Sequence, residues 1–264
     1  MIVRILGCHG SELITTDSRG RLHECKACGF LVNGTCMVDA GSITGSLVEA
    51  EQDKIRNVLL SHAHFDHIKG VPLLADNMVG RTHGTPINIW GLPEVVHLVR
   101  QHIFNGEIYP DFARLPTVEV APLTFQPFLD EKPIQLDGIE AVPVRVNHSV
   151  PAVGFLIRDE KTAFLYSGDT AETRRIWELG KEERRLKAAF IETSFPNDLK
   201  DVAKASGHLT PDMLRGEIVK LGRPDLPVYI YHLKPSYLER IKTDLNALRL
   251  PNLHFLEEGQ VITL

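Results

Sequence analysis

Three histidines and one aspartate lie within six consecutive positions, directly after a short apolar run, and this cluster restricts the fold more than any other feature. Segment 61–67 reads SHAHFDH, and residues 58–60 before it read VLL. Burying unpaired imidazole and carboxylate groups is costly, whereas both groups are good ligands for divalent metal ions. The cluster therefore predicts a metal site at the end of a buried strand. The alternative is a polar turn that contains several histidines.

Three more residues of the ligand type each follow another apolar run. They are His148 after residues 141–146, Asp169 after residues 163–166 and His232 after residues 228–231. A single histidine serves packing more often than metal binding. However, the shared position after a strand predicts that these side chains meet the first cluster at one rim of the sheets.

The seven positions together supply five imidazoles and two carboxylates: His62, His64, Asp66, His67, His148, Asp169 and His232. Seven ligands suit two metal ions that share one carboxylate and one hydroxide. Such pairs, about 3.5–4 Å apart, activate a bound water at neutral pH. We expect two divalent ions, with zinc first and manganese or iron as alternatives, because these ligands accept all three metals.

The remaining apolar runs predict a mixed fold of strands and helices in a single domain covering residues 1–264. The predicted strands are residues 3–6, 29–32, 36–38, 58–60, 87–90, 141–146, 152–157, 163–166, 188–191, 228–231 and 260–264. The predicted helices are residues 93–104, 172–186, 211–221 and 236–248. Strands dominate the first half and alternate with helices in the second, which favours sheets covered by helices on their outer faces.

Composition excludes several classes of protein. The net charge of −5 gives no electrostatic reason to expect stable nucleic-acid binding. No stretch approaches about 18 apolar residues, so no membrane segment is expected. The first residues lack the features of a signal peptide, which predicts a cytoplasmic protein. The oligomeric state stays open, with a homodimer as one alternative.

The histidine–aspartate run, together with His148, Asp169 and His232, resembles the metallo-β-lactamase superfamily over nearly the whole chain. The resemblance implies an α/β fold, a four-layer αβ/βα sandwich with metals at one edge. Five segments narrow it to the class II cyclic-nucleotide phosphodiesterases: 62–70 (HAHFDHIKG), 102–112 (HIFNGEIYPDF), 190–197 (FIETSFPN), 207–214 (GHLTPDML) and 231–235 (YHLKP). Phe65 departs from the family motif, which usually has leucine there.

The resemblance also implies a role for each ligand. His62, His64 and His148 would hold the first metal, and Asp66, His67 and His232 the second, with Asp169 bridging; Asp66 is also counted as catalytic. Asp39 would orient ligands from behind.

The family reaction is the hydrolysis of 3′,5′-cyclic AMP or cyclic GMP to the 5′-monophosphate by a metal-bridging hydroxide. We expect His208 to donate a proton to the leaving 3′ oxygen, and Glu192 to hold His208 charged and oriented. The alternatives are a packing histidine and an ordinary buried carboxylate.

Other functions stay open at this point. The tRNA 3′-end endonuclease of the same superfamily shares the segment around Asp169 and the Glu192–His208 pair, but it uses a long basic arm that this sequence lacks. Hydrolases of esters, thioesters, lactones and lactams are the next alternatives. A metal-binding scaffold without catalytic activity is the least favoured.

The four cysteines lie within the first 36 residues and predict no disulfide framework. Cys25 and Cys28 have the spacing of a zinc site, with His23 and Cys36 as neighbours in the sequence. The alternative, which we favour, is that Cys8, Cys25, Cys28 and Cys36 are small buried apolar residues. His9, His83 and His254 have no partner that the sequence identifies.

Overall fold

Two seven-stranded sheets form the body of this computed structural model, which describes residues 1–16, 20, 22–81 and 85–264. The first sheet has the order β16 (Val261–Thr263), β1 (Ile2–Gly7), β4 (Gly29–Val32), β5 (Cys36–Val38), β6 (Asn57–Leu59), β7 (Ile87–Gly91), β8 (Leu123–Pro127). The second has the order β15 (Leu253–Phe255), β14 (Val228–Tyr231), β13 (Leu186–Glu192), β12 (Ala163–Tyr166), β11 (Val153–Arg158), β10 (Ile139–Arg145), β9 (Ile134–Leu136). A separate hairpin pairs β2 (Leu13–Thr16) with β3 (Leu22–Cys25). His83 lies outside the described residues.

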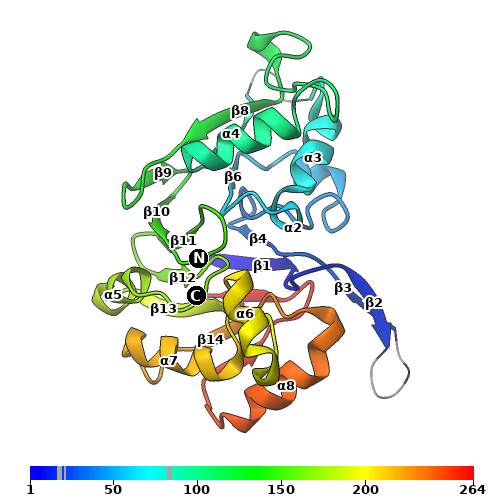
Figure 1. Cartoon of the computed structure of the whole chain (residues 1–264). Coiled ribbons are helices and arrows are strands. Elements are labelled where there is room, and N and C mark those ends of the chain that lie inside the picture. The colour runs from blue at the N-terminus through cyan, green and yellow to red at the C-terminus, as the bar shows by residue number, and fades with distance from the viewer. Residues whose placement is uncertain (17–19, 21, 82–84) are drawn as a thin grey trace.

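Helices cover the outer faces of the sheets (Figure 1). They are α1 (Glu49–Gln52), α2 (Phe65–Ile68), α3 (Gly70–Met78), α4 (Pro93–His102), α5 (Arg175–Glu182), α6 (Lys200–Ser206), α7 (Pro211–Leu221) and α8 (Leu238–Ala247), with short 3₁₀ turns at Val118–Val120, Asn197–Leu199 and Pro235–Tyr237. Helices α4 and α7 each begin with a proline, which costs no hydrogen bond in the first turn. In the described part of the chain, no helix is both long enough and apolar enough to cross a membrane.

The core between the sheets is rich in aromatic side chains. The ring of Phe30, from β4, lies 5.2 Å from Tyr166 of β12, 5.6 Å from Phe190 of β13 and 5.4 Å from Tyr231 of β14. These contacts join the inner faces of the two sheets. A second buried cluster, which includes Trp177, lies between the second sheet and helices α5, α7 and α8. The result is the four-layer αβ/βα sandwich that the resemblance implied.

Both sheets change from antiparallel to parallel pairing halfway across. Strands β12, β13, β14 and β15 pair in parallel, so their carboxyl ends lie along one edge of the second sheet. Strand β10 is separated from β12 by one antiparallel strand and therefore ends at the same edge. In the first sheet, β5 and β6 are also parallel neighbours. This topology gathers residues that follow different strands, as the sequence predicted.

All eleven predicted strands are present, with ends that move by up to two residues, and the four predicted helices are also present. The helix expected over residues 172–186 is shorter, because β13 already begins at Leu186. The segment expected as a helix over residues 236–248 begins instead as a 3₁₀ turn. Strands β2, β3, β8, β9 and β15 and helices α1, α2, α3 and α6 were not predicted. Most of these elements are short or have a solvent-exposed face, which weakens their hydrophobic periodicity.

Candidate metal centre

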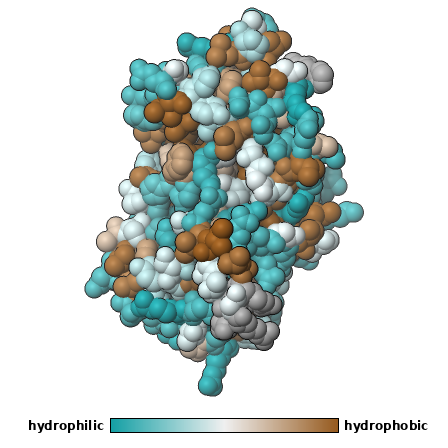
Figure 2. Space-filling model, turned by 90° about the vertical axis from the view of Figure 1, so that its right-hand side faces the viewer, coloured by the Kyte–Doolittle hydropathy of each residue, from teal (hydrophilic) through white to brown (hydrophobic). Residues whose placement is uncertain are grey.

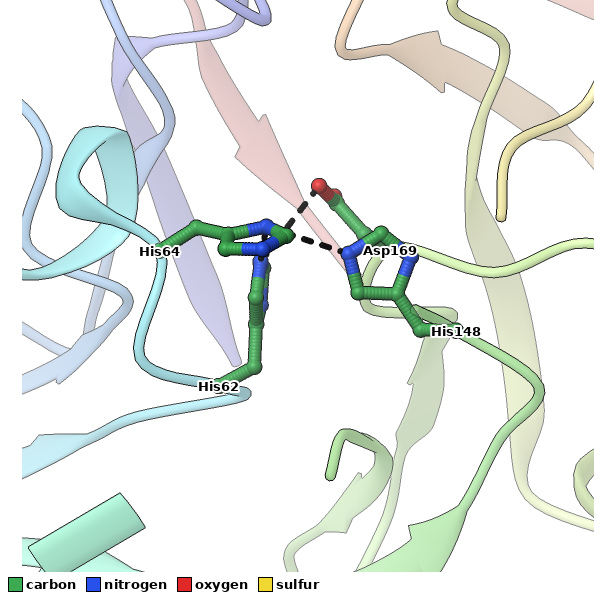
Figure 3. A group of neighbouring side chains, drawn as sticks. All are labelled: His62, His64, His148 and Asp169. Atoms are coloured by element: carbon green, nitrogen blue, oxygen red, sulfur yellow. Dashed lines mark hydrogen bonds and ion pairs between the residues drawn. The ribbon is translucent and has the colours of Figure 1, made fainter. Parts of the chain in front are cut away.

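Four of the predicted ligands converge from the two halves of the chain. His62 and His64 follow β6, whereas His148 follows β10 and Asp169 follows β12. Figure 3 shows these four side chains pointing toward a common space, where their ligand atoms all lie within 4.8 Å of one another. Nδ1 of His64 lies 3.0 Å from Nε2 of His62 and 3.2 Å from Nε2 of His148. This is a three-histidine group with a carboxylate beside it.

A second group lies next to the first. Asp66 and His67 belong to the short helix α2, and His232 follows β14. The ligand atoms of these three residues also lie within 4.8 Å of one another. Oδ2 of Asp66 is 3.8 Å from Nε2 of His67 and 3.5 Å from Nε2 of His232. All seven predicted ligands therefore gather in two neighbouring groups.

Asp169 lies between the two groups. Its Oδ2 is 3.6 Å from Nε2 of His62, 3.3 Å from Nε2 of His67 and 3.1 Å from Nε2 of His232. Its Oδ1 is buried and has no hydrogen-bond partner among the described residues. An unpaired buried carboxylate oxygen is costly unless a cation or water satisfies it. The carboxylate of Asp169 is thus within reach of histidines from both groups.

Hydrogen bonds on the outer side orient the histidine rings of both groups. Nδ1 of His67 is 2.8 Å from Oδ2 of Asp39, and Nδ1 of His148 is 2.8 Å from the carbonyl oxygen of Gly207. Both oxygens are acceptors, so each histidine donates its Nδ1 proton. Consequently Nε2 of both rings points into the centre, and a neutral ring held in this way is the tautomer that a metal ligand needs.

Serine hydroxyls orient the other two rings in the same way. Ser61 donates to Oδ2 of Asp39 and therefore accepts from Nδ1 of His62, at 2.9 Å. Ser194 donates to Oε2 of Glu192 and accepts from Nδ1 of His232, at 2.7 Å. The Nε2 atoms of these four rings, with Nδ1 of His64, therefore face one another across short distances. Lone pairs in such an arrangement repel unless a cation lies between them, so the donor set fits divalent metals.

The electrostatics of the cluster also favour bound cations. Burial lowers the pKa of His62, His64 and His148, which keeps these imidazoles neutral and able to coordinate. Burial alone would lower the pKa of His67 as well, but the carboxylates of Asp169 and Asp39 outweigh it and raise that pKa. The field at His67 therefore stabilises positive charge.

Asp39 supports the centre from behind, as predicted. It is fully buried, and it accepts hydrogen bonds from the backbone and hydroxyl of Ser61, from His67 and, at 2.6 Å, from the hydroxyl of Tyr166. The sequence analysis did not identify Tyr166, Ser61 or Ser194. The two serines stand next to residues of the quoted motifs, whereas the apolar run that contains Tyr166 gave no signal.

Glu192 and His208 form the predicted pair. Oε1 of Glu192 is 2.9 Å from Nδ1 of His208. Burial raises the pKa of Glu192 to about 8, and burial lowers the pKa of His208. Burial therefore disfavours the charged form of each group, while Oε1 of Glu192 also accepts hydrogen bonds from the backbone of Thr170 and Leu209. The ligand atom of His208 also lies within 4.8 Å of those of Asp169 and His232, so His208 borders the centre.

Two glycines allow the backbone to approach the histidines closely. A Cβ atom on Gly10 would lie 2.6 Å from Cε1 of His232. A Cβ atom on Gly207 would lie 2.8 Å from Nδ1 of His148, and Gly207 also has a φ of +77°. Neither position has space for a side chain.

An apolar pocket of about 710 Å³ lies beside helix α2, although none of the seven ligand residues lines it. Its lining includes Phe65, between the ligands His64 and Asp66, and also Leu13, Ile14, Leu73 and Tyr109. Figure 2 shows the face that carries the β2–β3 hairpin and α3, with apolar side chains in separate patches among polar ones. Exposed apolar patches often mark ligand-binding surfaces.

The segment 102–112 contributes unevenly to this pocket. Tyr109 lines it. Phe104 is buried and packs against Phe125 and Tyr109. The side chain of Asn105 accepts hydrogen bonds from the backbone of its own loop.

Comparisons with known proteins identify the family and the fold of this chain. Residues 40–224 match the family model described as a beta-lactamase superfamily domain. The chain is 30% identical over 211 residues to a probable 3′,5′-cyclic-nucleotide phosphodiesterase of Yersinia pestis; the match covers 70% of this chain and 59% of that protein. It is also 30% identical over 138 residues to a ribonuclease Z of Methanococcus maripaludis, covering 52% and 42% of the two chains. The crystal structure of unliganded yeast PDE1 has the same fold, with a TM-score of 0.80, 18% identity and coverage of 100% and 99%.

Proposed function

Because this chain belongs to the beta-lactamase superfamily, we propose that it is a metal-dependent phosphodiesterase that hydrolyses 3′,5′-cyclic nucleotides to 5′-monophosphates. The observation that carries the proposal is the position of Asp169, whose Oδ2 lies within 3.6 Å of histidines from both ligand groups. Relatives named as cyclic-nucleotide phosphodiesterases support the substrate class.

The two groups divide the ligands between two divalent ions, for which zinc is our first candidate. His62, His64 and His148 would hold one ion; Asp66, His67 and His232 would hold the other, with Asp169 shared. Bound there, the ions would lower the pKa of water and neutralise charge on the phosphate oxygens. The protein's own contribution is a rigid set of rings, fixed by Asp39, Ser61, Ser194 and the Gly207 carbonyl.

His208 is our candidate for the proton donor. Its Nδ1 faces Oε1 of Glu192, so the proton it would donate is on Nε2. As the bond from phosphorus to the 3′ oxygen breaks, Nε2 gives its proton to that oxygen, and Nδ1 keeps the proton that it shares with Oε1 of Glu192. The pair thus supplies one proton while its net charge changes from neutral to −1. Water restores the proton after product leaves.

The apolar pocket beside Phe65 and Tyr109 is our candidate site for the base. A purine presents a flat face that stacks on aromatic rings. Phe65 is 64% exposed, although it is a large apolar residue next to two ligands, and a stacked base would cover it.

A ribonuclease Z is the second candidate function, because such an enzyme from Methanococcus maripaludis is similar to half of this chain. The net charge of −5 weighs against it, since gripping an RNA backbone requires basic residues.

Product analysis would test the proposal. The protein is reconstituted with zinc or manganese, given 3′,5′-cyclic AMP, and compared with a chelated sample. Release of 5′-AMP that the chelator abolishes is the expected result. Intact cyclic AMP in a sample that binds two metal equivalents would contradict the proposed substrate class. It would not contradict the proposed metal centre. A precursor tRNA in parallel reactions tests the second candidate.

A further inference from the structure

A second group of metal-ligand side chains lies near the amino-terminal strand, apart from the candidate centre. His9 follows β1, His23 and Cys25 belong to β3, and Glu258 lies between β15 and β16. The ligand atoms of His9, His23 and Cys25 all lie within 4.8 Å of one another. Alternate residues of a strand point to the same side, so His23 and Cys25 face His9 together.

His9 is oriented in the way that metal-binding histidines are. Its Nδ1 lies 2.7 Å from Oε1 of Glu258, and the same oxygen accepts a hydrogen bond from the backbone of Lys26. A carboxylate behind one ring nitrogen fixes the tautomer and leaves Nε2 free to coordinate. His9 is only 4% exposed and Cys25 only 1%, so these polar atoms are buried in a cluster.

We propose that His9, His23 and Cys25 bind one zinc ion at a site distinct from the candidate metal centre. Two imidazoles and one thiolate are a ligand set that zinc prefers. His9 and His23 also line a pocket of about 550 Å³, from which a water or another donor atom completes the tetrahedron. This site is not the Cys25–Cys28 site considered from the sequence, because the sulfur of Cys28 instead donates to the carbonyl oxygen of His9.

The site would attach the β2–β3 hairpin to the body of the protein. That hairpin forms its own two-stranded sheet. Its residues Leu13 and Ile14 form part of the wall of the 710 Å³ pocket, whereas His23 lies on the pocket of about 550 Å³. A zinc ion bound to β3 and to His9 would therefore hold one wall of the larger pocket in place.

Cobalt(II) distinguishes the two sites without any measurement of turnover. A thiolate bound to cobalt(II) gives a charge-transfer absorption in the near ultraviolet, and the candidate centre contains only imidazole and carboxylate ligands. The full chain is loaded with cobalt(II), or with zinc for metal analysis after dialysis. We compare the wild type with Cys25→Ser and His23→Asn. The matched control is Cys36→Ser, because Cys36 is also a buried thiol but lies in β5.

The expected result is a thiolate band in the wild type and in Cys36→Ser that is lost in Cys25→Ser and weakened in His23→Asn. Both site variants should bind one metal equivalent fewer than the control, whatever the total. If the band is absent in the wild type, or remains in Cys25→Ser, the proposal that Cys25 binds a metal ion with His9 and His23 is wrong. If Cys25→Ser fails to fold, the half-buried His23→Asn still decides, because equal metal content in that variant and the control contradicts the proposal.

Discussion

The two halves of the molecule deliver ligands to the candidate centre in different ways. The first half supplies four of the seven from one short segment, with His62 and His64 on a loop and Asp66 and His67 on the helical turn that follows. The second half supplies three, His148, Asp169 and His232, each from the end of a different strand. A contiguous motif depends on local geometry, whereas separate ligands depend on the register of a whole sheet.

This difference has a consequence for sensitivity to mutation. A ligand in the contiguous segment has neighbours that hold the same ion. A ligand from the second half is the single contribution of its strand, and Asp169 in addition contacts both groups. We therefore expect the largest effects where the two halves meet, and smaller ones where a side chain supports only one half.

Asp169→Ala should have the largest effect. Loss of the carboxylate that contacts both groups should lower kcat/KM by roughly 10³-fold or more, about 4 kcal/mol of transition-state stabilisation. Metal content should fall from two equivalents, as measured by mass spectrometry on dialysed protein. Asp169→Asn is the matched variant of similar size. Full activity in Asp169→Ala would contradict the bridging role.

His208→Ala should have the second-largest effect. We expect kcat to fall by roughly 10²–10⁴-fold, as for the loss of a general acid. Two metal equivalents should remain, because we place His208 beside the centre and not among its ligands. A substrate with a good leaving group, such as a nitrophenyl phosphodiester, should lose much less rate, since its departing oxygen needs no proton. Loss of one metal equivalent would instead make His208 a ligand together with Asp169 and His232.

Asp39→Asn should reduce metal affinity by about 10–100-fold, because an amide nitrogen cannot accept the Nδ1 proton of His67. Ser194→Ala removes the corresponding acceptor for His232 in the second half. We expect a smaller loss there, about tenfold, since a hydroxyl is neutral. Competition with a fluorescent zinc chelator measures both affinities. A larger effect for Ser194→Ala would show that the second half depends more on its supporting hydrogen bonds.

Glu183→Gln should leave activity unchanged and affect only stability. Hydrogen bonds from Arg185 and Arg158 lower the pKa of the Glu183 carboxyl to about 2, below its usual value of 4.5. A lowered pKa stabilises the folded state above pH 4.5, and this contribution is lost as the pH falls toward 2. Because both arginines are about one-third exposed, we expect the variant to lose about 1–2 kcal/mol at pH 7.

Urea denaturation at pH 7 and pH 3 measures that difference, which should shrink by more than half at the lower pH. A difference that does not change with pH would show that Glu183 acts through packing. The variant also serves as an activity control, since within the described chain no hydrogen bond or ion pair joins the Glu183 side chain to a ligand of either group.

The sequence predicted which candidate ligands come together, because most of them follow strands. Each strand end was visible as the end of an apolar run, and parallel pairing then places those ends along one edge. The same reasoning missed Ser61, Ser194 and Tyr166, which act through hydrogen bonds that depend on side-chain orientation. The sequence identified no partner for His9, and its contact with Glu258 joins residues 249 positions apart. Such a contact depends on the order of the strands in the sheet, and hydrophobic periodicity in the sequence does not reveal that order.

The burial of the Glu192–His208 pair was also beyond sequence reasoning. Burial raises the pKa of Glu192 and lowers the pKa of His208, and the sequence predicted neither shift. Burial is a property of the assembled core, so the residue types alone do not reveal it. The short helix α2 was missed for a related reason, because its polar ligands interrupt the apolar periodicity that identifies helices.

The two glycines packed against histidines have a consequence for experiments that map essential positions. In a scan of every single substitution scored by activity, Gly10 and Gly207 should rank with the histidines, although neither has a functional group. Any side chain at these positions would meet the His232 or His148 ring at less than 3 Å. Such a map would therefore identify positions where a side chain has no space beside a histidine ring, in addition to the residues that carry out the chemistry.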